Sequence, residues 1–216
     1  MFFVGRKNEI RLVIKTLERN ASIIITGKYG IGRTALAKHI ADIARDRWHF
    51  VMADFSRIAS KACFDIFDQL FSSTQAHKKQ RHLHYKPMRF RIANSTVNDT
   101  RKPVIVLDNI EKLPPRRLDF IRYIAAEEHF QFVAITESFL PQADFMKLRT
   151  VLMPSITINL GRLGHASTME FFRHFAPRCG WTESRIKSLS EITNGYPLMM
   201  VDAVVRGCVR KQHMSR

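Results

Sequence analysis

The sequence predicts an α/β fold: a three-layer α/β/α core with a parallel five-stranded sheet, followed by a small C-terminal helical lid. Short apolar runs alternate with helical stretches up to about residue 160, and strands that are joined by helices pair in parallel. Beyond Gly161 the apolar residues have helical spacing only. We therefore expect a core domain at residues 1–160, and a lid with a basic C-terminus at residues 161–216.

The individual elements follow from the spacing of the apolar residues. A first helix is predicted because Ile10, Val13, Ile14 and Leu17 would lie on one helix face. Strands are predicted, in chain order, at 23–25, 48–53, 104–107, 130–136 and 156–160. Further helices are predicted at 35–44, 64–71 and 118–124, and in the lid at 168–175, 183–192 and 198–209. Apolar runs without alternation are typical of strands that are buried on both faces.

A glycine-rich loop, TGKYGIGRT at residues 26–34, follows the first predicted strand. Such a loop binds phosphate because glycines let consecutive backbone N–H groups surround the phosphate oxygens, and the next helix adds the positive end of its dipole. Thr34 supplies a hydroxyl for Mg²⁺, whereas Arg33 stands where these loops usually have lysine, and its planar fork is not equivalent. The alternative is a chance glycine-rich turn. The predicted phosphate-loop contacts are Gly27, Lys28, Tyr29, Gly30, Ile31, Gly32, Arg33, Thr34 and Ala35.

A second motif, VIVLD, ends the predicted strand at 104–107 with the carboxylate of Asp108. An acid at the carboxyl end of a buried strand is the Walker B arrangement, in which the carboxylate holds Mg²⁺ through water. We therefore predict Thr34 and Asp108 as the metal-binding residues. The alternative for Asp108 is a cap for the following loop.

With these motifs the chain resembles the AAA+ class of P-loop NTPases, in its origin-recognition and STAND-type branch. Two further stretches carry the resemblance: FVGRKNEI at residues 3–10, similar to the N-terminal box of the branch, and NGYPL at 194–198, similar to the Gly-x-Pro element of the helical lid. The resemblance implies ATP with Mg²⁺ as cofactors and assembly of subunits around ATP. It adds Gly5, Arg6 and Pro197 to the residues expected to contact the nucleotide.

The catalytic positions depart from the family pattern. The residue after Asp108 is usually a glutamate that activates water, but here it is Asn109, which cannot accept a proton. Glu111 could substitute, or it could cap a helix. The two departures, at Asn109 and at Arg33, together predict that ATP hydrolysis is slow or absent.

Two more residues have roles that only the resemblance implies. Thr136, at the end of a predicted strand, matches the sensor-1 position, although it could equally start a turn. Arg149 lies where the family has an arginine finger that reaches the γ-phosphate of a neighbouring subunit; the alternative is a solvated surface arginine. The candidate catalytic residues are Asp108, Asn109, Glu111, Thr136 and Arg149.

The charge of the chain predicts a polyanionic partner. Lys and Arg number 35 against 19 Asp and Glu, which gives a net charge of +16. A predicted basic insertion, at about residues 75–98, has no acidic residue. We expect its cations to contact the backbone of duplex DNA without strong sequence preference; a solvated insertion and an anionic membrane surface are the alternatives. The predicted DNA-binding residues are Lys78, Lys79, Arg81, Lys86, Arg89 and Arg91.

Two classes of function remain open from the sequence. The first is a DNA-associated ATPase that forms a homo-oligomeric ring or filament and has a protein partner in a DNA-transaction complex; residues 107–113 are similar to small target-selection ATPases of transposons. The second is a STAND-like nucleotide switch with little hydrolysis. Three widely spaced cysteines predict a reducing compartment without a disulfide framework. Without a signal peptide or membrane span, we expect a cytoplasmic, nucleoid-associated protein and no membrane partner.

Overall fold

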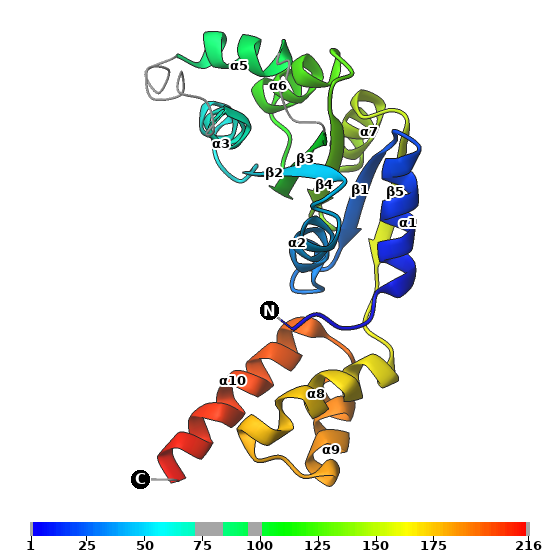
Figure 1. Ribbon diagram of the computed structural model, residues 1–216, viewed down its shortest axis with the longest axis vertical. Helices are drawn as coiled ribbons and strands as arrows, with labels where there is room; N and C mark the ends of the chain where they lie inside the picture. Colours follow the sequence, from blue (N-terminus) through cyan, green and yellow to red (C-terminus); the bar gives the residue numbers. More distant parts are fainter. Residues whose placement is uncertain (1, 72–83, 95–100, 215–216) are drawn as a thin grey trace.

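The computed structural model describes residues 2–71, 84–94 and 101–214, and its core is built on one parallel sheet (Figure 1). The strands are β1 (Ser22–Gly27), β2 (Trp48–Asp54), β3 (Lys102–Ile110), β4 (Gln131–Thr136) and β5 (Ser155–Leu160). They are all parallel and lie in the order β2-β3-β4-β1-β5. The predicted fold class is confirmed, and each of the five predicted strands is present.

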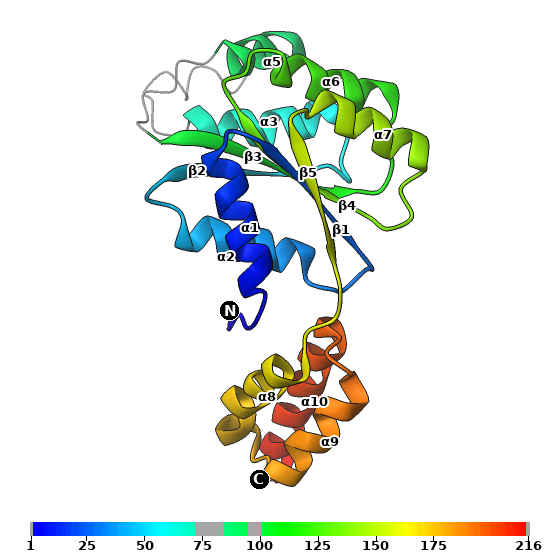
Figure 2. The same ribbon diagram turned by 90° about the vertical axis from the view of Figure 1, so that its right-hand side faces the viewer.

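Helices cover both faces of this sheet (Figure 2). One face is covered by α1 (Lys7–Glu18) and α2 (Arg33–Ile43), whose apolar side chains form a core with β1. The other face is covered by α3 (Ala59–Phe71), α5 (Tyr85–Ala93), α6 (Pro115–Ala125) and α7 (Gln142–Val151). The sequence patterns had not indicated α5 and α7. The helix α5 lies within the segment 75–98, and its Met88 and Ile92 are buried in the core of this second face.

The parallel arrangement places the candidate site residues at one edge of the sheet. Strand β1 ends at Gly27, β3 carries Asp108 near its carboxyl end, and β4 ends at Thr136. In an open parallel sheet, ligands bind in the crevice outside the carboxyl ends of the strands. The fold therefore brings together motifs that are separated by about a hundred residues in the sequence.

After β5 the chain forms a lid of three helices: α8 (His165–Cys179), α9 (Glu183–Thr193) and α10 (Pro197–Met214). The lid has its own apolar cluster, which includes Phe172, Ile186 and Met200. Val4, from the segment before α1, is buried in the same cluster. The N-terminal segment is consequently shared between the lid and the core. No helix in the described part of the chain is long and apolar enough to cross a membrane.

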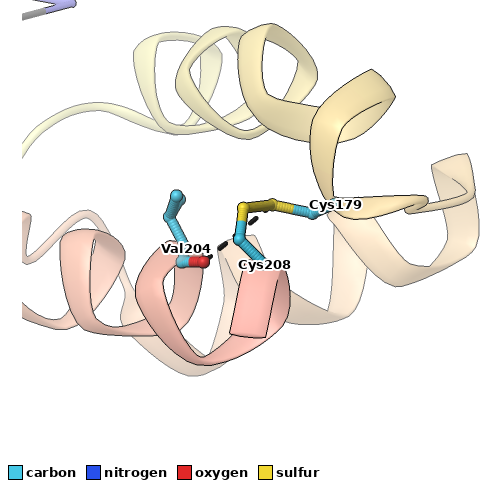
Figure 3. Close-up of a disulfide and its surroundings, with 3 residues drawn as sticks. All are labelled: Cys179, Val204 and Cys208. Carbon is cyan, nitrogen blue, oxygen red and sulfur yellow. Dashed lines mark hydrogen bonds between the residues drawn. A yellow bond between two sulfur atoms is a disulfide. The ribbon is translucent and has the colours of Figure 1, made fainter. Parts of the chain in front are cut away.

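The lid also contains a disulfide bond, between Cys179 at the end of α8 and Cys208 in α10 (Figure 3). Their Cα atoms are 4.6 Å apart although 29 positions separate them in the sequence. Our expectation of unpaired cysteines was wrong, because the packing of α8 against α10 brings these two together. Cys63 is free and buried in the core. The cysteines therefore no longer support a reducing compartment.

Candidate functional site

The glycine-rich loop connects β1 to α2 and has a backbone that only glycine adopts easily. Gly30 and Gly32 have φ angles of 76° and 93°, in the left-handed region. A Cβ atom added to Gly30 would lie 2.7 Å from the side chain of Leu198. Gly32 is the N-cap of α2 and has no side chain to satisfy the first N–H groups of that helix. These N–H groups and the helix dipole form a site suited to an anion.

Thr34 and Asp108 meet beside this loop. The Thr34 hydroxyl donates a hydrogen bond to Asp108 Oδ1 at 3.0 Å. Burial raises the pKa of Asp108, and the nearby Asp54 carboxylate adds to this effect, whereas the hydrogen bonds from Thr34 and from the Asn109 N–H oppose it. A hydroxyl and a carboxylate are hard oxygen ligands of the kind that Mg²⁺ takes together with water and phosphate oxygens. The two predicted metal-binding residues are thus together, with chemistry that fits Mg²⁺.

Arg33 does not extend into solvent from the loop. Its side chain is only 7% exposed, and its guanidinium donates to the Thr136 carbonyl oxygen and to the Glu137 carboxylate. The hydroxyl of Thr136 and Oε2 of Glu137 are buried without a hydrogen-bond partner among the described residues. The sequence analysis missed Glu137, although a carboxylate directly after a strand end at this edge was a usable signal.

Asn109 contacts a second carboxylate that the sequence analysis also missed. Its backbone N–H donates to Asp108 at 2.9 Å, and its side-chain amide donates to Asp54 Oδ1 at 3.2 Å. Asp54 and Asp108 are direct neighbours in the pairing of β2 with β3. Burial raises the pKa of Asp54, but hydrogen bonds from Ser56 and Asn109 outweigh this and hold it below its usual value. The side chain of Glu111, by contrast, is exposed to solvent.

Arg6 supports the loop from the N-terminal segment. Its guanidinium donates to the carbonyl oxygens of Ile31, at 3.1 Å, and Gly161, at 2.6 Å, and it forms an ion pair with Glu9. Gly5 precedes it with a φ of 72°, and a Cβ atom there would lie 2.9 Å from Ser167. These two residues therefore fix the loop and the start of the lid relative to each other.

The lid contacts the loop through its Gly-x-Pro element. The backbone N–H of Leu198 donates to the Gly30 carbonyl at 3.1 Å, and the Tyr196 hydroxyl donates to the Tyr29 carbonyl. Gly195 has a φ of 67°, and a Cβ atom there would lie 2.0 Å from the Leu163 carbonyl oxygen. A larger residue at position 195 would consequently push the lid away from its own connection to β5.

An apolar pocket lies where the N-terminal segment, the loop and the lid meet. It is lined chiefly by Phe3, Val4, Ile31, Leu163, Pro197 and Met200. Ligand pockets are mostly apolar with a few polar groups that fix the orientation of the ligand. This pocket lies directly beside the glycine-rich loop. It includes Pro197, which the sequence analysis had assigned to nucleotide contact.

Arg149 makes no hydrogen bond to the glycine-rich loop or to Asp108 in the described part of the chain. It is exposed in the last turn of α7, and it forms no ion pair with a described residue. Its guanidinium is thus available to another molecule.

The predicted DNA-binding residues are only partly within the described chain. Lys78, Lys79 and Arg81 lie outside the described residues. On α5, Lys86 and Arg91 are exposed, whereas Arg89 is partly buried with its guanidinium 4.1 Å from the ring centre of Tyr123. The guanidinium of Arg89 therefore packs against an aromatic ring and is less accessible to DNA than Lys86 and Arg91 are.

Comparisons with known proteins agree with this geometry. A family model described as an AAA ATPase domain matches residues 3–135. Among solved structures, the Orc1 protein of Aeropyrum pernix in complex with DNA is similar with a TM-score of 0.68 and 14% identity, over 98% of this chain and 62% of that one. A search among curated proteins finds no match.

Two further structures share the fold. The RuvB Holliday junction branch migration motor of Thermotoga maritima has a TM-score of 0.59 at 14% identity, over 94% of this chain and 62% of that one. A STAND protein with a tetratricopeptide repeat sensor from Pyrococcus horikoshii has a TM-score of 0.55 at 20% identity, over 92% of this chain and 29% of that one. The present chain thus spans less than two thirds of the length of each of these proteins, and identities this low establish similarity of fold alone.

Proposed function

The chain belongs to the AAA ATPase domain family, and on that premise we propose that it binds ATP with Mg²⁺ at the loop between β1 and α2. The observation that carries the proposal is the hydrogen bond from Thr34 to Asp108, 3.0 Å long, beside the glycine-rich loop. The loop N–H groups would hold the phosphates, and the base would lie toward the junction of the N-terminal segment, the loop and the lid. Mg²⁺ held by Thr34 and Asp108 would neutralise charge on the phosphates.

Calorimetric titration tests this proposal. The wild-type chain should bind ATP more tightly with Mg²⁺ than without it, and Thr34→Ala should weaken Mg²⁺–ATP binding by at least about tenfold, the equivalent of 1.4 kcal/mol. Ser184→Ala, at an exposed serine on α9, is the matched control and should bind as the wild type does. The absence of binding heat with both ATP and ADP in the wild type would refute the proposal.

We infer further that hydrolysis is slow. Asn109 cannot accept a proton from water, and Arg33 is held by Glu137 in the described arrangement. For the biological role, we propose a regulator of a DNA transaction that assembles into a ring or filament around ATP, in association with the nucleoid. Its support is the net charge of +16 and the exposed Arg149, which forms no ion pair with another residue of the described ranges.

A second candidate function is a nucleotide-dependent switch without appreciable turnover, as in STAND-type proteins. The buried Arg33–Glu137 ion pair favours it. Because Glu137 already binds the guanidinium, Arg33 is not free to stabilise the phosphates during hydrolysis, and the site suits nucleotide binding better than fast hydrolysis. Retention of duplex DNA at about 0.1 M salt, where electrostatic interactions extend about 10 Å, would favour the DNA-transaction role. Nucleotide-dependent capture of a protein partner, with no DNA affinity, would favour the switch.

A further inference from the structure

The outer face of α1 carries a row of four cations that the sequence analysis did not single out. Lys7, Arg11, Lys15 and Arg19 recur every four residues, and all four side chains are exposed. We refer to these residues as the α1 basic stripe. The opposite face of the helix is anchored in the core, because Val13 and Leu17 are almost completely buried. The direction in which the stripe points is therefore fixed by packing.

The charges of the stripe are not neutralised within the described part of the chain. The two acids of α1 have other partners: Glu9 pairs with Arg6 at 3.1 Å, and Glu18 pairs with Arg47 at 2.6 Å. None of the four stripe cations forms an ion pair with a described residue. Like charges four positions apart repel one another and destabilise a helix, so the stripe opposes the stability of α1 until an anion lies along it.

More basic residues extend the stripe at the amino-terminal edge of the sheet. Lys102, at the start of β3, donates to the side chain of Asn20 at 2.8 Å, directly after the end of α1. Arg101 donates to the carbonyl oxygen of Arg45 at 2.9 Å. Lys102 thus places a cation next to the end of α1. The helix α1 lies on the side of the sheet opposite α5 (Figure 2).

We propose that the α1 basic stripe binds the phosphate backbone of double-stranded nucleic acid, and this rests on the proposed DNA association. From Lys7 to Arg19 the helix rises by about 18 Å, which corresponds to about five nucleotides at 3.4 Å each along one strand. Four cations would therefore face a comparable number of phosphates. The stripe itself contains no aromatic side chain, so it lacks the stacking groups that single-stranded nucleic acids use.

The geometry favours a nucleic acid over a membrane surface. A helix that binds a membrane buries its apolar face in the lipid, but the apolar face of α1 is already buried against the sheet. The exposed side of α1 presents a band of charge that winds slowly around the helix axis, and an extended array of cations suits a linear polyanion. Contacts to phosphates alone carry no sequence information, so the surface should bind unrelated duplexes equally well.

The test is fluorescence anisotropy with two unrelated duplexes over a salt series, using the full chain. The variant Arg11→Gln/Lys15→Gln/Arg19→Gln should lose at least tenfold in affinity for both duplexes, and the log–log salt slope should become shallower by about 2.7, or 0.9 per lost phosphate contact. The matched control is Arg178→Gln/Arg185→Gln/Lys187→Gln, which removes three exposed lid cations and should change affinity less than threefold. Both variants should bind Mg²⁺–ATP as the wild type does, and the stripe variant should melt at the same temperature or slightly higher, because it removes like-charge repulsion along α1.

Other outcomes would contradict either the assignment of the surface or the DNA association itself. If the stripe variant bound the duplexes with wild-type affinity and an unchanged salt slope, the assignment of this surface would be overturned. An equal loss of affinity in the lid control would overturn it as well. Loss of binding in Lys86→Gln/Arg91→Gln alone would place the surface on α5. If the wild type bound neither duplex, the proposed DNA association would itself be wrong. Binding only to vesicles that contain phosphatidylserine would identify a membrane surface instead.

Discussion

Arg33 of the glycine-rich loop forms a buried ion pair with Glu137, the residue that follows β4. The same guanidinium donates to the Thr136 carbonyl oxygen, so the end of β4 engages the cation that would otherwise contact phosphates. If ATP binds as proposed, it would therefore compete with a carboxylate for Arg33. A hydrogen bond that involves a charged group contributes about 1.5–3 kcal/mol, which is large compared with the binding energy available from one side chain.

Glu137→Gln should release Arg33 for the nucleotide. Glutamine has the same shape and can still accept a hydrogen bond, but it has no charge, so Mg²⁺–ATP affinity should rise by about tenfold, or 1.4 kcal/mol. Stability without nucleotide should fall by about 3 kcal/mol or more, because a buried charge loses its partner. Calorimetry and thermal unfolding measure the two effects. Unchanged affinity in a folded variant would mean that the pair does not compete with phosphate.

Asp108→Asn should stabilise the nucleotide-free protein at neutral pH. The pKa of Asp108 is raised in the folded state by burial, so the folded chain holds its proton more tightly than the unfolded chain does. Wild-type stability therefore decreases as the pH rises from the unfolded pKa, 3.8, through the higher folded pKa. The asparagine variant lacks this penalty, and its advantage in melting temperature should shrink as the pH falls through that window.

The same substitution should remove most of the additional stability that Mg²⁺–ATP gives. A ligand that binds only the folded state stabilises it by about 2.7 kcal/mol when present at 100 times its dissociation constant. Melting curves with and without Mg²⁺–ATP provide the comparison. A variant that Mg²⁺–ATP still stabilised as much as the wild type would exclude Asp108 from the metal site.

Asn109→Glu should increase ATP turnover. A positioned general base contributes about a hundredfold or more to a rate, and position 109 directly follows Asp108 at the edge of the sheet. Asn109→Ala is the control, since it removes the contact to Asp54 without adding a base. Release of inorganic phosphate is the measurement. Equal rates in both variants would place the limitation at Arg33 or elsewhere.

Arg149→Ala should reduce assembly or turnover without changing nucleotide affinity. The side chain is exposed on α7 and can reach only the phosphates of a neighbouring subunit in the proposed role. Light scattering with ATP, phosphate release and calorimetry together separate these effects. If assembly and activity stayed at wild-type levels, Arg149 would be an ordinary surface charge.

Reduction of the Cys179–Cys208 bond should destabilise the lid. A disulfide that closes a loop of about 30 residues contributes about 3–4 kcal/mol, because it lowers the conformational entropy of the unfolded chain. Unfolding of the lid, followed by fluorescence of Trp181, should therefore shift to lower denaturant when reductant is added. The variant Cys179→Ser/Cys208→Ser should not respond to reductant. A wild-type lid that was equally insensitive would indicate that this bond does not form.

The sequence predicted the sheet well because its strands are runs of apolar residues buried on both faces. Ile23 and Val104, for example, are completely buried in the described structure. The positions of the glycine-rich loop and of Asp108 were predictable for a related reason: a turn with positive φ angles needs glycine, and Asp108 directly follows an apolar run that forms a buried strand.

The remaining features depend on contacts between distant parts of the chain. The sequence places Glu137 and Asp54 at strand ends, but their partners, Arg33 and Asn109, are specified only when the parallel strands align those ends. The helices α5 and α7 have weak apolar periodicity, so helical spacing did not reveal them. The Cys179–Cys208 pair depends on how α8 packs against α10, which cysteine spacing alone does not specify.

The lid is attached to the loop by the main chain as well as by side chains. Leu198 donates its backbone N–H to Gly30, so no substitution other than proline at position 198 can delete that donor. Any rotation of α10 about the connection at Gly161 would have to break this bond and the one from Tyr196. The glycine-rich loop and the lid are therefore coupled through these two hydrogen bonds, so a backbone shift at Gly30 would have to move the start of α10 with it or break the bond to Leu198.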